Sequence, residues 1–153
     1  MNKILLLIKQ EFAGKIIIDE DIELQPKGNR GIYGLYIKKT DGEECAYIGR
    51  SEEVGRRIAV HLLKIIDGDH AASKLNKAFL EDESTIICKF VEPVEYVFDD
   101  YCKDAQRLAS RECFWIDKYQ KMNQCLEQVP EGTRPSKEWW EKEKNKKDKL
   151  AKA

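Results

Sequence analysis

Four side chains that suit phosphodiester hydrolysis lie close together in the first half of the sequence. Tyr33 ends the tripeptide GIY and Tyr47 begins the tripeptide YIG. Arg57 and His61 follow four residues apart, which on a helix places both side chains on one face. An arginine fork matches a phosphate, and a phenol and an imidazole can exchange a proton. If a carboxylate joined them, these groups could cleave a phosphodiester bond.

A carboxylate in an unusual position comes from a long predicted helix at residues 99–121. One side of this helix is apolar, and the position that completes the apolar side is Glu112. An ionisable group among apolar residues costs several kcal/mol unless it is neutralised. Metal ligation would neutralise it, and so would a buried arginine partner; the helix pattern alone leaves both open.

The two tyrosines are expected on paired strands, at residues 31–38 and 45–49, because both stretches are rich in aromatic and β-branched residues. A two-residue Asp41–Gly42 loop would put Tyr33 and Tyr47 on opposite faces of the hairpin. A three-residue loop over 40–42, with a bulge at Gly42, puts them on the same face. Since the tyrosines would act together, we predict the bulged loop or another of the same parity.

The elements after the hairpin are predicted from their apolar spacing. A helix with an apolar stripe at Val54, Ile58, Leu62 and Ile65 carries Arg57 and His61 on one edge. A shorter helix at residues 72–80 and a third strand at 85–91 follow, before the helix that holds Glu112.

Size and composition indicate one soluble, globular domain inside the cell. The chain has 153 residues, of which 42% are hydrophobic and 36% charged. Its five cysteines form no CxxC pair, which favours reduced thiols over a disulfide framework or a zinc site. The apolar residues near the start are too few to span a bilayer. We therefore expect a cytoplasmic protein that does not associate with membranes.

The two ends of the chain are expected to lie outside the central domain at residues 31–125. Residues 1–30 are predicted to pack on one face of the core; the apolar run at 3–9 fits either a strand or a helix. Residues 126–153 form a basic, partly helical tail, with eight Lys or Arg against four Asp or Glu from residue 134 onward. From Ser136 it is predicted to form a capped helix, pinned to the body by Trp139 and Trp140 or contacting phosphates as an arm.

In this order and spacing the residues resemble the GIY-YIG nuclease family. GIY, YIG, an arginine eight residues after the YIG glycine and a histidine four residues later all match the family pattern. The stretch from Asp69 to Leu75, which contains His70, is similar to the stretch before the second helix of homing-type members. The segment around Glu112 is similar to the family's glutamate helix. The resemblance covers about residues 31–123.

The resemblance implies an α+β fold: a small three-stranded antiparallel sheet flanked by helices, with one divalent metal, Mg²⁺ or Mn²⁺, per site. It implies that Tyr33 acts as general base or proton relay, that Tyr47 supports it, and that His61 takes the proton from that tyrosine. Arg57 would bind the scissile phosphate and Glu112 would be the only protein ligand of the metal. Asn123 corresponds to the family's late asparagine, and His70 is a further candidate site residue, whose alternative role is to cap the next helix.

The expected function is that of a metal-dependent endonuclease acting on DNA, duplex or branched. A catalytically silent nucleic-acid-binding or adaptor module with the same fold is the alternative from another class, and RNA is the alternative substrate. Almost no sequence remains for a separate DNA-binding domain. Contacts to DNA would then come from the basic tail and the first 30 residues, from a homodimer, or from a recruiting protein.

Overall fold

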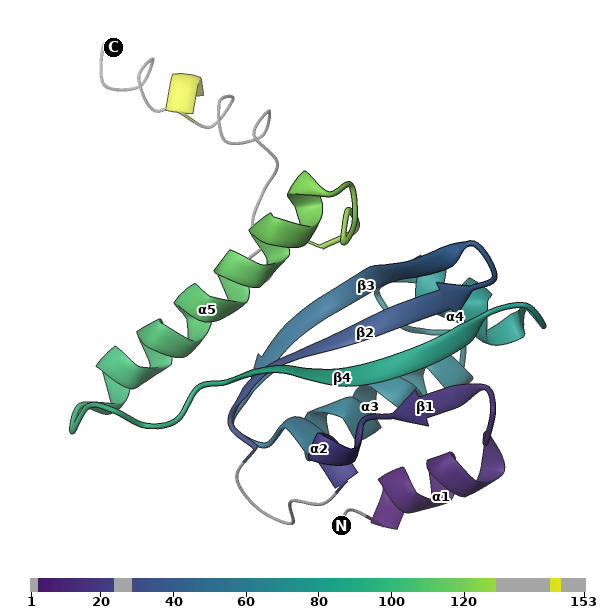
Figure 1. Ribbon diagram of the computed structural model, residues 1–153. Helices are drawn as coiled ribbons and strands as arrows, with labels where there is room; N and C mark the ends of the chain where they lie inside the picture. Colours follow the sequence, from purple (N-terminus) through teal and green to yellow (C-terminus); the bar gives the residue numbers. More distant parts are fainter. Residues whose placement is uncertain (1–2, 24–28, 129–143, 147–153) are drawn as a thin grey trace.

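The computed structural model describes residues 3–23, 29–128 and 144–146. Figure 1 labels the elements, which follow the order α1 (Lys3–Glu11), β1 (Ile16–Ile18), α2 (Glu20–Glu23), β2 (Gly31–Lys39), β3 (Gly42–Ser51), α3 (Val54–Ile66), α4 (Ser73–Leu80), β4 (Thr85–Pro93) and α5 (Tyr101–Lys121). The apolar run that fitted both strand and helix is therefore the helix α1. Most of the predicted tail helix, including Trp139 and Trp140, lies outside the described residues.

The sheet has four strands, in the order β1-β4-β2-β3. Strand β2 pairs antiparallel with both β3 and β4, as expected for a three-stranded sheet. The three-stranded antiparallel prediction is wrong in one respect, because β1 adds a parallel strand beside β4. Three isoleucines are too short a run to show a period, and a parallel partner 70 positions further along leaves no local signal.

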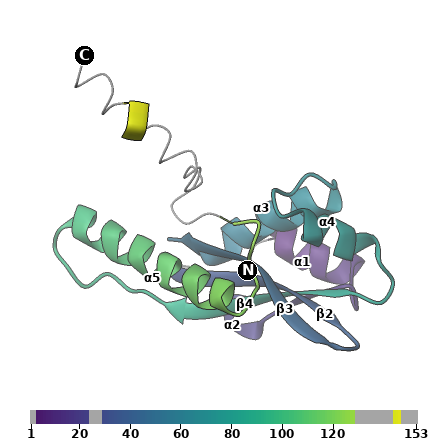
Figure 2. The ribbon, with the colours of Figure 1, turned by 90° about the horizontal axis from the view of Figure 1, so that it is seen from above.

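Helices cover both faces of this sheet. Helices α1, α3 and α4 lie on one face and α5 on the other, as Figures 1 and 2 show. Residues of β2 alternate between the two layers: Tyr33 and Leu35 belong to the core under α1, α3 and α4, whereas Ile32 and Tyr36 belong to the core under α5. The alternation of a strand therefore places Ile32 and Tyr33 of the GIY tripeptide in the two different cores.

The two tyrosines share a face, but not for the predicted reason. Lys39 pairs with Gly42, so that the loop has two residues and the wrong parity. The register then shifts inside the hairpin, where Tyr36 pairs with Cys45 and Leu35 with Tyr47. This bulge inserts one extra residue in β3 and turns Tyr47 to the face of Tyr33. The prediction about the face is confirmed, and the prediction about the loop is wrong.

The chain after α5 returns across the outer edge of β3 and covers its unpaired backbone groups. Gln124 accepts a hydrogen bond from the Cys45 N–H at 2.6 Å, and Gln128 accepts one from the Ile48 N–H at 2.8 Å. The Glu127 carboxylate then receives the Lys74 N–H of α4 at 3.2 Å. Residues 122–128 therefore link α5, the edge strand and α4.

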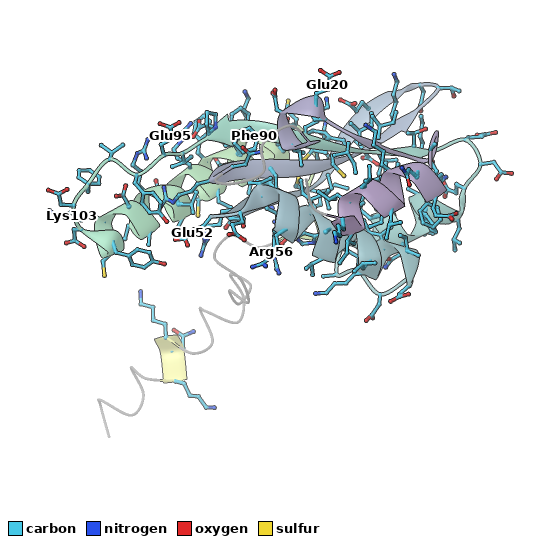
Figure 3. The ribbon with its side chains drawn as sticks, turned by 90° about the horizontal axis from the view of Figure 1, so that it is seen from below. Glu20, Glu52, Arg56, Phe90, Glu95 and Lys103 are labelled. Atoms are coloured by element: carbon cyan, nitrogen blue, oxygen red, sulfur yellow. The ribbon has the colours of Figure 1, made fainter. Side chains whose placement is uncertain are left out.

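The connection from β4 to α5 is held by a buried carboxylate. Asp104 is fully buried, and its two carboxylate oxygens accept the N–H groups of Val97 and Phe98, both at 3.0 Å. The buried Arg30 donates to the carbonyl oxygens of Val94 at 2.6 Å and Asp104 at 2.9 Å. Glu95 and Lys103, labelled in Figure 3, flank this connection. Together these bonds set where α5 begins and so where its glutamate lies.

Replacing Asp104 should destabilise the protein strongly. Asp104→Ala leaves two backbone N–H groups without their acceptor, which we expect to lower the free energy of unfolding by about 2–4 kcal/mol. Urea denaturation followed by circular dichroism measures the change. Asp117→Ala is the control, because this carboxylate lies on the same helix but is 63% exposed beside Lys121; its effect should stay within about 0.5 kcal/mol. Equal losses of unfolding free energy in the two variants would show that Asp104 does not hold the connection from β4 to α5.

Candidate active site

Tyr33 is the buried centre of the candidate site. Its side chain is 1% exposed, and its hydroxyl lies 2.6 Å from Nε2 of His61 on α3. The ring crosses the backbone at Gly49, where a Cβ atom would lie 2.3 Å from the hydroxyl oxygen. At Gly31 a Cβ would lie 2.1 Å from the carbonyl oxygen of Glu92 on β4. The two glycines of the GIY and YIG tripeptides are therefore needed for close approach.

A second histidine continues the hydrogen-bond chain behind Tyr33. Nδ1 of His61 lies 2.7 Å from Nε2 of His70, and Nδ1 of His70 accepts the Ala72 N–H at 2.9 Å. Both imidazoles are buried, with 4% and 5% of their surface exposed. The Tyr47 ring packs against both, with centroids 4.8 Å from His61 and 5.3 Å from His70. The predicted residues Tyr33, Tyr47, His61 and His70 thus form one aromatic cluster.

Arg57 brings positive charge to the open side of this cluster. Burial raises the pKa values of Tyr33 and Tyr47, and the Arg57 guanidinium opposes this rise for both phenols. A surface pocket of ≈ 380 Å³ opens beside it, lined by Ser51, Glu52, Glu53, Arg56, Arg57 and Val60. Glu52 and Arg56 mark this pocket on the outside of the molecule in Figure 3. An anionic group that entered the pocket would meet Arg57.

Glu112 reaches the cluster from α5, on the other face of the sheet. Burial is the main cause that raises the pKa values of Tyr33 and Tyr47, and the Glu112 charge adds to this rise for both phenols. Its Oε1 accepts a hydrogen bond from the Arg50 guanidinium at 2.7 Å. The Glu112 side chain is 12% exposed and the Arg50 side chain 39%. An arginine therefore does neutralise this glutamate, at a position that remains partly open to solvent.

Arg50 is the residue of the site that the sequence reasoning missed. It directly follows the YIG tripeptide, and from the sequence we expect only a surface or DNA-backbone-contacting residue at this position. Strand alternation carries the signal: Tyr47 and Gly49 face α3, so Arg50 faces α5. The register that shows this depends on the bulge in β3, which the sequence did not reveal.

Burial sets the protonation of the cluster near neutral pH. Desolvation raises the pKa of Tyr33 well above its ordinary value, with further contributions from Tyr47 and Glu112. It also raises the pKa of Tyr47. For the histidines, burial favours the uncharged ring and lowers the pKa of His61 to about 3 and that of His70 to about 4. At pH 7 the free protein holds neutral phenols and neutral imidazoles beside Arg57 and the Arg50–Glu112 pair.

Asn123 follows the C-terminal end of α5, which ends at Lys121. It has the left-handed conformation, with φ 63°, and its N–H donates to the Gln120 carbonyl oxygen at 3.0 Å. Among the described residues, no hydrogen bond joins it to Tyr33 or to either histidine. The structure thus gives it a helix-terminating position, and a role in the site stays a prediction.

The metal-ligating groups of the site are few. Within residues 3–23, 29–128 and 144–146, no three His, Cys, Asp or Glu side chains gather in a way that could hold a metal ion. Glu112 offers a single carboxylate near the phenols. That donor set fits Mg²⁺, which keeps several waters and takes one or two carboxylates together with substrate phosphate. It does not fit a zinc site built wholly from protein side chains.

The chain was compared with protein-family models, curated proteins and solved structures. Residues 31–124 match the model of the GIY-YIG catalytic domain. The chain belongs to the GIY-YIG family. No curated protein matches it significantly. One solved structure with similarity is that of the catalytic domain of the homing endonuclease I-TevI, with 23% sequence identity and a TM-score of 0.42 over 60% of this chain and 88% of that chain.

Family membership gives this cluster its context, because GIY-YIG domains are typically nuclease domains. The matched range begins at the first glycine of GIY and ends after Asn123, so it contains all the predicted site residues. No helix in the described part of the chain is both long and apolar enough to cross a bilayer.

The buried histidines should make the stability of this GIY-YIG domain pH-dependent. Their folded-state pKa values, about 3 and about 4, lie below the value of about 6.5 in an unfolded chain. Between these limits the unfolded chain binds more protons, so the free energy of unfolding decreases as the pH falls below 6.5. Above pH 6.5 the contribution is fully present. We expect a loss of about 2–4 kcal/mol between pH 7 and pH 5, measured by urea denaturation.

The control for this pH dependence is the double variant His61→Gln/His70→Gln, which has no imidazole left to titrate because the chain contains only two histidines. Its unfolding free energy should change much less between the same two pH values. A wild-type protein equally stable at pH 5 and pH 7 would contradict the assignment of two neutral buried rings.

A single methyl group at Gly49 should disable the site. In Gly49→Ala the new Cβ meets the Tyr33 hydroxyl oxygen and ring, so the hydroxyl must move away from His61. A displacement of about 1 Å can cost 10²-fold in rate, and we expect at least that loss in a nuclease assay. Gly55→Ala on α3 is the control: its Cβ would lie 3.6 Å from Leu5, an ordinary contact. Full activity of Gly49→Ala would show that the position of the phenol does not matter.

Proposed function

We propose that this chain is a metal-dependent endonuclease that hydrolyses phosphodiester bonds of DNA to a 5′-phosphate and a 3′-hydroxyl. One observation carries the proposal: the Tyr33 hydroxyl lies against Gly49, the next residue, Arg50, holds the Glu112 carboxylate of α5 at 2.7 Å, and Arg57 of α3 lines the open pocket nearby. The phenol, the arginine of α3 and the carboxylate are a group that can move a proton, a group that binds phosphate and an acid suited to a divalent cation.

Each residue takes the role that its surroundings support. Arg57 lines the open pocket and binds the scissile phosphate, because its charge and planar fork match that group. The Tyr33 hydroxyl acts as general base or proton relay for the attacking water: the neutral phenol accepts that proton as it passes its own to a phosphate oxygen or to solvent on the open side. Tyr47 packs against the histidines and keeps water away from the buried side of the cluster. Arg57 at the open pocket would contact the substrate, while the buried His61 and His70 hold the cluster in position.

Glu112 would hold Mg²⁺ or Mn²⁺. When bound, the ion supplies Lewis-acid stabilisation of the charge on the phosphate and on the leaving oxygen. Arg50 lies beside the same carboxylate and supplies the countercharge that a partly buried acid needs. A single carboxylate leaves most ligands to water and to the phosphate, which agrees with the preference of Mg²⁺ for oxygen ligands and retained water.

DNA is proposed as the substrate and the basic tail as a source of phosphate contacts. Residues 134–153 carry eight basic and four acidic residues, while the rest of the chain has a net negative charge. Binding to DNA backbone should therefore be weak and salt-sensitive, with most counterion release coming from the tail. A homodimer or a recruiting protein would supply the specificity that a small domain lacks. We place this activity in the cytoplasm.

Cleavage of supercoiled plasmid DNA tests the proposal. The wild-type protein should nick or linearise the plasmid with Mg²⁺ or Mn²⁺ and leave it intact with EDTA. Arg57→Ala and Glu112→Gln should each reduce the rate about 10²- to 10³-fold, because each removes a charge that stabilises the transition state.

Two exposed residues of α5 provide controls. Lys121→Ala removes a cation whose side chain is 76% exposed beside Asp117, outside the pocket that contains Arg57, and it should cleave at nearly the wild-type rate. Asp117→Asn changes an exposed acid on the same helix as Glu112 and should also stay active. Cleavage of structured RNA with intact plasmid would identify RNA as the substrate. Failure to cleave any nucleic acid with either metal would favour a silent binding or adaptor module.

A further inference from the structure

The hydrogen-bond chain behind Tyr33 starts from a group whose proton position is fixed. The Ala72 backbone N–H points at Nδ1 of His70 from 2.9 Å. A backbone amide can only donate, so Nδ1 of His70 is an acceptor and carries no proton. A neutral imidazole has one proton, which in His70 must therefore sit on Nε2.

The same reasoning passes to the next ring. Nε2–H of His70 points at Nδ1 of His61 across 2.7 Å, so that nitrogen must accept. The single proton of a neutral His61 then sits on its Nε2. This nitrogen lies 2.6 Å from the Tyr33 hydroxyl oxygen, to which it donates.

We propose that the Ala72 amide and His70 hold His61 in the Nε2–H tautomer, so that His61 donates a hydrogen bond to the Tyr33 oxygen instead of taking the proton of Tyr33. This differs from the role that family resemblance implies for His61. Its catalytic meaning rests on the nuclease function proposed above, whereas the tautomers themselves do not. His70 and the Ala72 amide are positioning groups, which act through His61.

The opposite arrangement would be costly inside this cluster. If Tyr33 instead donated a hydrogen bond to Nε2 of His61, the single proton of the neutral His61 would sit on Nδ1 and point at His70. His70 would then need its own proton on Nδ1, facing the Ala72 N–H, or two N–H groups would face each other. A buried donor that faces another donor loses its hydrogen bond to water and gains none in return. A cationic His61 is disfavoured as well, since burial and the neighbouring Arg57 and Lys64 charges lower its pKa.

His70 is clamped in place by its backbone as well as its ring. Its N–H donates to Oδ1 of Asn76 at 3.1 Å, and its carbonyl oxygen accepts from Nδ2 of Asn76 at 2.9 Å. Asn76 belongs to α4, the helix whose first turn follows Ala72. These bonds fix the His70 backbone, and the ring cannot turn away from His61 without losing its hydrogen bond from the Ala72 N–H at the start of this helix.

The consequence for Tyr33 is that its oxygen accepts a hydrogen bond from the histidine chain instead of donating one to it. The O–H of the phenol then has to point toward the open side of the site, where Arg57 lies and where water or a bound phosphate can accept its hydrogen bond. Negative charge that develops on the oxygen is stabilised by the His61 N–H, which is already in place.

Nuclear magnetic resonance of the histidine side chains tests this lock on the His61 tautomer directly. Long-range ¹H–¹⁵N spectra of the full ¹⁵N-labelled chain distinguish Nε2–H, Nδ1–H and imidazolium forms, and two histidines give an uncrowded spectrum. We expect both rings to be neutral Nε2–H tautomers at pH 7. A proton on Nδ1 of either ring at pH 7 would overturn the proposal.

A pair of nearly isosteric variants separates the lock from a merely structural role. In His70→Gln the side-chain NH₂ can still donate to Nδ1 of His61, so His61 should keep the Nε2–H signature. In His70→Glu the carboxylate can only accept, so His61 must place a proton on Nδ1, as Nδ1–H tautomer or as imidazolium. An unchanged Nε2–H tautomer in His70→Glu would show that position 70 does not control His61.

These spectra need no substrate, so the two proposals can fail separately. Nε2–H tautomers in a protein that cleaves nothing would sustain the lock and refute the nuclease function. An active nuclease whose His61 carries its proton on Nδ1 would sustain the function and refute the lock.

Discussion

The structure depends on one buried polar contact, the hydrogen bond between the Tyr33 hydroxyl and His61. A phenol in the interior must have a partner, since an unsatisfied hydroxyl would cost more than its hydrogen bond contributes. His61 is itself buried, so its other ring nitrogen also needs a hydrogen-bond partner, which is His70. His70 in turn is hydrogen-bonded by the Ala72 backbone N–H. The candidate site is therefore continuous with the hydrophobic core on the α3 side of the sheet.

The other half of the site depends on the edge strand β3. This strand carries Tyr47 on the α3 face and Arg50 on the α5 face, where Arg50 pairs with Glu112. It therefore contributes to the site in both layers. The bulge in β3 makes this division possible, because without the extra residue Tyr47 would face α5. The return segment 122–128 binds the outer edge of the strand through Gln124 and Gln128, which protects an edge that would otherwise be open to pairing. Fixing the edge also fixes α5, and with it Glu112.

The sequence was informative where side chains of known chemistry stand in local patterns. Strand pairing around Tyr33 and Tyr47, the helix with Arg57 and His61, and the helix with Glu112 all follow from periodicity and turn residues, and family membership confirms the GIY-YIG resemblance. The missing parts are non-local. Parallel pairing of β1 with β4 joins residues far apart in sequence, and the bulge in β3 depends on packing on both faces. Arg50 could not be assigned to Glu112 before the register of that strand was known.

The environments on the two sides of Tyr33 explain why its neighbours differ in kind. On the buried side, low polarity strengthens each hydrogen bond but penalises charge, and that side holds only neutral rings in a fixed order. On the open side, solvent lowers the cost of ionised groups, and that side holds Arg57, Arg50 and Glu112. An arginine in the place of His70 would leave a buried charge without a partner, and a histidine in the place of Arg57 would lose its charge above its pKa. In the function we propose, both kinds of neighbour serve one task, which is to hold the phenol oxygen beside the scissile phosphate and its attacking water.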